Sequence, residues 1–115
     1  MNAPERHELF VLPEGESKVS MQLNSKILNA ATFTIRLEDH TLGNLIRSEL
    51  LKDPDVLFAG YRVPHPLVHN VELKLQVTNK TTPVDAMKKV IRKAIGDVVD
   101  LEDQLKKEMN KQRSY

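Results

Sequence analysis

The side chains best suited to metal or acid–base chemistry in this 115-residue chain are histidines and one adjacent pair of acids. His65 and His69 are four residues apart, a spacing that directs two imidazoles to one metal only within a helix, and Pro66 lies between them. Glu38 and Asp39 are adjacent, so at a strand end their carboxylates point to opposite sides and do not form the pair that glycoside hydrolysis uses. We therefore expect no metal, no cofactor and no catalytic residue.

The composition narrows the class of protein. Hydrophobic residues make up 40% and charged residues 29%, values typical of a soluble globular domain. Aromatic residues make up only 4%, which argues against a nucleic-acid platform built on stacked rings. Cysteine is absent, as is common in reducing intracellular compartments. We find no segment with the length of a membrane span and no signal peptide.

One local basic cluster raises the possibility of nucleic-acid binding. Lys88, Lys89, Arg92 and Lys93 are close in sequence and could contact phosphate groups. Acidic residues follow from position 97 onward, and a basic helical face opposite an apolar one is commonly just solvated. An independent nucleic-acid-binding module thus stays open as an alternative.

Hydrophobic periodicity predicts four strands and a short helix before residue 80. The predicted strands are residues 18–23, 33–37, 56–63 and 71–77. Asp39 can cap the short helix and Asp53-Pro54 can end it, while Gly60 suggests a bulge in the third strand. The expected fold is a two-layer α+β sandwich, β-β-α-β-β-α, with a four-stranded antiparallel sheet and both helices on one face. We assign residues 1–17 to an N-terminal arm, with residues 9–12 as a possible docking patch, and residues 18–115 to one domain.

The last third of the chain, from Thr82 to about residue 112, predicts one long amphipathic helix. Thr82 can cap it, Pro83 suits its first position, and apolar residues recur in heptad steps of three and four. About 30 residues at 1.5 Å rise give a rod of roughly 45 Å, longer than so small a domain can cover. We expect its outer half to pack on another chain; bending back into the core, or fraying beyond Gly96, is the alternative.

Two further strings stand out. The first runs from Asp39 to Asn44, where Gly43 would let the first turn of the helix approach another backbone, and Thr41 and Asn44 could bond free N–H groups. The second runs from residue 58 to 67 and includes Pro64, His65 and Pro66, which would close one end of the sheet. Ordinary turn and cap chemistry would also explain both strings.

The strings EDHTLGN (38–44) and FAGYRVPHPL (58–67) together resemble the alpha-like assembly subunits of multisubunit RNA polymerases. That family comprises the eleventh subunit of RNA polymerase II, its counterpart shared by polymerases I and III, and archaeal subunit L. It is related to the dimerisation domain of the bacterial alpha subunit. The opening, residues 1–18, resembles the polymerase II branch. The likeness covers nearly the whole chain and is weakest after Gly96.

The resemblance implies a non-catalytic nuclear subunit that pairs through its helices with the third subunit of RNA polymerase II. The pair would then join the second-largest subunit and the tenth and twelfth subunits, and direct contact with nucleic acid is not expected. Membership of polymerases I and III, and a small homodimeric enzyme or coactivator on a similar frame, remain alternatives. The apolar pattern alone accepts a homodimer as readily as a heterodimer.

Residue roles follow from combining the pattern with the resemblance. The expected partner interface comprises Leu42, Leu45, Ile46, Ile91, Ala94, Ile95, Val98, Leu101, Leu105 and Met109. The family motif comprises Asp39, His40, Thr41, Gly43, Asn44, Gly60, Tyr61, Pro64, His65 and Pro66. Glu108 lies where the apolar stripe would place another apolar residue, so contact ends there or Glu108 pairs with a base on the partner.

Overall fold

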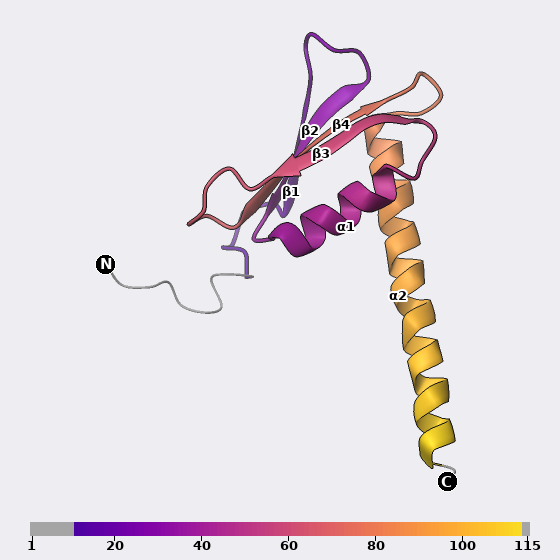
Figure 1. Cartoon of the computed structure of the whole chain (residues 1–115). Helices are drawn as coiled ribbons and strands as arrows, with labels where there is room; N and C mark the ends of the chain where they lie inside the picture. The colour runs from indigo at the N-terminus through magenta and orange to yellow at the C-terminus, as the bar shows by residue number, and fades with distance from the viewer. Residues whose placement is uncertain (1–10, 114–115) are drawn as a thin grey trace.

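Four strands and two helices follow one another in the predicted order β-β-α-β-β-α (Figure 1). The computed structural model describes residues 11–113. The elements are β1 (Val19–Leu23), β2 (Ala30–Arg36), α1 (His40–Leu50), β3 (Val56–Arg62), β4 (Asn70–Val77) and α2 (Pro83–Arg113). The predicted boundaries are close to these, although β2 begins three residues earlier than expected. Residues 9 and 10 of the proposed docking patch lie outside the described range.

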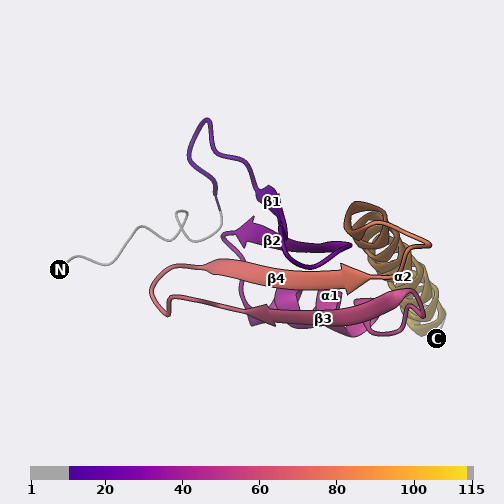
Figure 2. The same cartoon turned by 90° about the horizontal axis from the view of Figure 1, so that it is seen from above.

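The sheet is antiparallel throughout, with strand order β1-β2-β4-β3. Its helix-covered face holds the core, because every second residue of β4 from Val71 to Val77 is buried and the residues between them are polar. Phe33 and Ile35 of β2 pair with Leu73 and Val71, which continues this apolar face across the sheet. Figure 2 shows α1 behind β3 and β4, whereas α2 leaves the sheet at one end.

A sharp turn connects β2 to α1. Leu37 adopts a φ of 55°, in the left-handed region that a leucine rarely occupies, and redirects the chain towards the helix. Asp39 then caps α1, since its carboxylate accepts a hydrogen bond from the backbone N–H of Thr41 at 2.9 Å. The helix ends at Leu50, before the Asp53-Pro54 pair. The predicted cap is confirmed.

Helix α2 is continuous from Pro83 to Arg113, so the alternative of a bend or fraying at Gly96 is wrong. Thr82 caps it by accepting a hydrogen bond from the N–H of Asp85 at 3.1 Å. Only its first turns reach the core, and the rest points away from the sheet (Figure 1). The radius of gyration is 17.6 Å, against about 13 Å for a compact chain of this length. Neither helix in the described part of the chain is apolar enough over a sufficient length to cross a membrane.

Two details of the sheet differ from expectation. The bulge in β3 lies between Val56 and Phe58, not at Gly60. Gly60 instead leaves space for the Phe58 ring, since a Cβ at Gly60 would lie 3.1 Å from the ring. A glycine inside a strand indicates either a bulge or a close approach, and here it serves the second purpose.

Candidate partner-binding site

An apolar groove of about 290 Å³ lies between α1 and α2, and we refer to it as the helix groove. It forms because α1 lies on β3 and β4 while α2 leaves the sheet beside it, so the two helices diverge. Its lining residues are all aliphatic: Leu42, Leu45, Ile46, Val90, Ile91, Ala94, Ile95, Val98 and Val99. An open, wholly apolar surface of this kind is typical of a protein-interaction site.

The helix groove brings together all of the predicted interface residues from α1 and those of α2 as far as Val98. Val90 and Val99 also line it, and our prediction missed both. They follow the 3.6-residue period of a straight helix, which drifts away from the strict heptad that guided the prediction. Val90 is also buried in the core, so one side chain contributes to both surfaces.

Three predicted interface residues lie beyond the groove, and we call Leu101, Leu105 and Met109 the distal stripe. Their exposed fractions are 65%, 58% and 50%. Burying an aliphatic side chain of this size gains roughly 1.5–3 kcal/mol, so leaving three in water is costly for a small domain. Glu108, next to the stripe, pairs with Lys111 at 3.4 Å.

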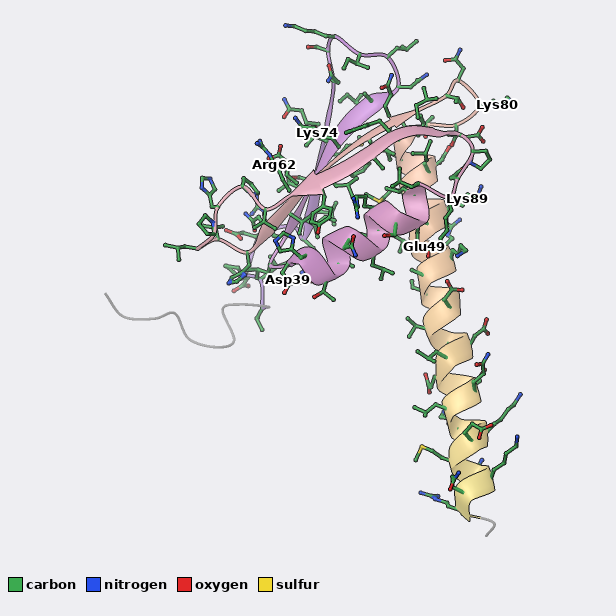
Figure 3. All side chains as sticks on the ribbon, viewed as in Figure 1. Asp39, Glu49, Arg62, Lys74, Lys80 and Lys89 are labelled. Atoms are coloured by element: carbon green, nitrogen blue, oxygen red, sulfur yellow. The ribbon has the colours of Figure 1, made fainter. Side chains whose placement is uncertain are left out.

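Ion pairs join the two helices at the end of α1. Lys93 of α2 contacts Glu49 of α1 at 2.7 Å, and Lys89 contacts Asp53, three residues after α1, at 3.5 Å. Figure 3 labels Glu49 and Lys89, which lie where the end of α1 meets α2. The hydrogen bond from Lys93 holds the pKa of Glu49 below its usual value, and the same bond raises the pKa of Lys93. Two cations of the basic cluster are thereby engaged with acids of the same chain, which weakens the nucleic-acid alternative.

The first turn of α1 packs against its own sheet, which corrects our expectation for Gly43. We expected Gly43 to admit another backbone, but it faces the ring of Tyr61 on β3, whose Cδ2 would lie 2.6 Å from a Cβ at that position. His40 Nδ1 and the Tyr61 hydroxyl are 3.0 Å apart, and Arg47 lies 5.8 Å from the ring centroid. Asn44 accepts a hydrogen bond from Arg47 at 2.7 Å instead of bonding a free backbone N–H.

Replacing Gly43 with alanine is expected to destabilise the fold. Alanine favours a helix over glycine by about 1 kcal/mol, but the new methyl group would overlap the Tyr61 ring, and overpacking costs about 1–3 kcal/mol. Urea unfolding should therefore show a net loss of up to about 2 kcal/mol. Gly96→Ala is the matched control, because a Cβ there meets nothing within 4 Å and should stabilise by up to about 1 kcal/mol. Equal effects at both positions would contradict this account.

Asp39 makes the cap of α1 sensitive to acid. The backbone hydrogen bond from Thr41 lowers the pKa of Asp39 below its ordinary 3.8. A depressed folded-state pKa means that the stabilisation is present above pH 3.8 and is lost as the pH falls through the folded value. The difference in unfolding free energy between the native chain and Asp39→Ala should be constant near neutral pH and should shrink below about pH 4. A difference that is the same at pH 7 and pH 3 would contradict the assignment.

The second motif string forms a turn. His65 and Val68 make an isolated antiparallel bridge, and the Val68 N–H donates to the His65 carbonyl at 3.3 Å. Within residues 11–113, the structure brings no three histidine, aspartate or glutamate side chains close enough to share a metal ion. The motif residues in this string thus have a structural explanation in closing the β3–β4 connection.

Comparison with known proteins gives a consistent result. Residues 30–104 match the family model described as the RNA polymerase Rpb3/Rpb11 dimerisation domain. The chain is 48% identical over 114 residues, 99% of its length and 95% of the relative's, to DNA-directed RNA polymerase II subunit rpb11 of Dictyostelium discoideum. It is 50% identical over 95 residues, 79% of its length and 76% of the relative's, to the subunit RPB11 of Schizosaccharomyces pombe. The solved structure of DNA-directed RNA polymerase subunit L from Thermoplasma acidophilum has a TM-score of 0.69 and 31% identity, and covers 85% of this chain and 96% of that one.

Proposed function

The chain belongs to the RNA polymerase Rpb3/Rpb11 dimerisation-domain family, and from this we propose that it is a non-catalytic assembly subunit of nuclear RNA polymerase II. The observation that carries the proposal is the aliphatic helix groove, continued by the distal stripe along α2. In the isolated chain these aliphatic side chains are exposed to water and forgo the free energy of burial. An exposed apolar surface of this kind indicates a protein partner.

We propose that this partner is the third subunit of RNA polymerase II. The family description names Rpb3 together with Rpb11 under one dimerisation domain, and the helix groove and the distal stripe provide an apolar surface for such dimerisation. The heterodimer would then associate with the second-largest subunit and with the tenth and twelfth subunits. In this role the chain provides a binding surface for other subunits and no catalytic residue. Residues 18–115 form one domain, and residues 1–17 form its N-terminal arm.

Co-expression with candidate partners tests the proposal. We expect a soluble one-to-one complex with the third subunit of polymerase II, and a weaker or aggregated product with its counterpart from polymerases I and III. Light scattering would give the mass of each product. Purification of the chain from cells, followed by identification of the largest associated subunit, would show whether it belongs to RNA polymerase II or to polymerases I and III. A chain that stays a monodisperse monomer and does not bind the third subunit would refute the proposal.

The nucleic-acid alternative has its own test. It requires that the isolated chain bind nucleic acid with an affinity that falls steeply as salt increases. We expect no such binding, because Lys89 and Lys93 are already paired with acids of the same chain.

A further inference from the structure

Strand β1 carries an apolar row that the described residues leave uncovered. Val19, Met21 and Leu23, the β1 row, are 49%, 42% and 64% exposed. Directly paired residues share one face of a sheet, so the row lies on the helix-covered face that contains the core. Its partners on β2 are all buried: Ile35, Phe33 and Ala31.

The arrangement of the helices explains why the row is open. Helix α1 packs on β3 and β4, and the first turns of α2 pack on β4 before the helix leaves the sheet. β1 is the edge strand on the far side, beyond both helices. The segment before β1 lies on the opposite face, where Glu16 pairs with Arg36 at 3.2 Å. The described part of the N-terminal arm therefore does not cover the row.

Helix α2 shows what a partner would place there. Its 31 residues span about 46 Å, and the 14 residues after Val99 extend about 20 Å beyond the helix groove. Because α2 points away from its own sheet, its distal part extends past the helix layer of its own chain (Figure 1). In a pair of such dimerisation domains related by an approximate two-fold axis, the distal half of the partner's long helix would extend toward this chain in the same way.

We propose that the β1 row binds an amphipathic helix of the partner subunit, the counterpart of the distal half of α2. This inference rests on the proposed function. The spacings agree, since alternate residues of a strand lie about 6.7 Å apart and residues four apart on a helix about 6 Å apart. A helix with aliphatic residues at every third or fourth position can thus follow the row.

A paired charge substitution within β1 tests the proposal in the co-expressed complex with the third subunit. Met21→Glu with Leu23→Glu should weaken the complex by about 10- to 100-fold, as expected for the loss of apolar interface contacts. Ser20→Glu with Gln22→Glu is the matched control, because it adds the same charge to the same strand on the opposite face. The control should change the affinity by less than about 3-fold, which is smaller than the effect of replacing an energetically important interface residue. Equal weakening by both pairs would overturn the proposal.

Photo-crosslinking identifies the occupant directly and does not depend on how the charged variants fold. A benzophenone amino acid at position 21 of the complex should crosslink to a helical peptide of the third subunit. A crosslink to residues 1–10 of this chain, to a second copy, or to nothing would overturn the inference. If Leu101→Asp with Leu105→Asp prevents pairing and the β1 pair has no effect, only the inference fails. If neither pair has an effect, the proposed function fails too.

Discussion

Aspartate at both Leu101 and Leu105 should abolish co-purification of the chain with the third polymerase subunit. Both side chains are more than half exposed in the single chain, so the substitutions remove almost nothing from its core. In the proposed complex they are buried, and each aspartate would place a charge in an apolar interface. Losing the burial of each leucine costs roughly 1.5–3 kcal/mol, so the affinity should fall at least about a hundredfold.

The control for this experiment is Lys107→Asp. It changes the net charge by the same two units as the double substitution, and it lies on the side of α2 opposite the distal stripe. The control should retain full co-purification, and circular dichroism should show a folded sheet in both variants. Unchanged co-purification of the double variant would remove the distal stripe from the interface.

Periodicity explains why so much of the fold could be predicted. The two-residue alternation of β4 indicates a strand, and the heptad steps of α2 indicate a helix. The capping residues Asp39 and Thr82 mark where the two helices begin. These signals are local, because each depends on residues within a few positions of one another.

The features that could not be predicted depend on contacts between distant segments. The alternation of β1 indicates which side of the strand is apolar, but not that both helices end short of it. Gly43 signals a close approach, yet only the fold shows that the approaching group is the ring of Tyr61, eighteen residues away. In the same way, Val99 joins the helix groove because α2 is straight, a property of the whole helix.

Leu50→Ala is expected to cause the largest loss of stability and to weaken pairing indirectly. Leu50 is the last residue of α1 and is fully buried in the core. Truncating such a leucine costs about 2–5 kcal/mol, because a cavity remains where the side chain was. Since a small domain has only about 5–15 kcal/mol of net stability, the variant should unfold at a much lower urea concentration.

The neighbouring leucine provides the comparison. Leu51 is 56% exposed, so Leu51→Ala changes the same residue type one position along and should cost less than about 0.5 kcal/mol. The two variants separate packing from partner binding, because Leu50 belongs to the core cluster that contains Met87 and Val90 of α2 but does not line the helix groove. A partner that binds only the folded state raises its stability by an amount that grows with the logarithm of the binding affinity. Adding the third subunit should therefore raise the midpoint of Leu51→Ala as much as that of the native chain, and raise that of Leu50→Ala less. Equal shifts would show that the groove keeps its shape without Leu50, and that the core and the pairing surface are independent.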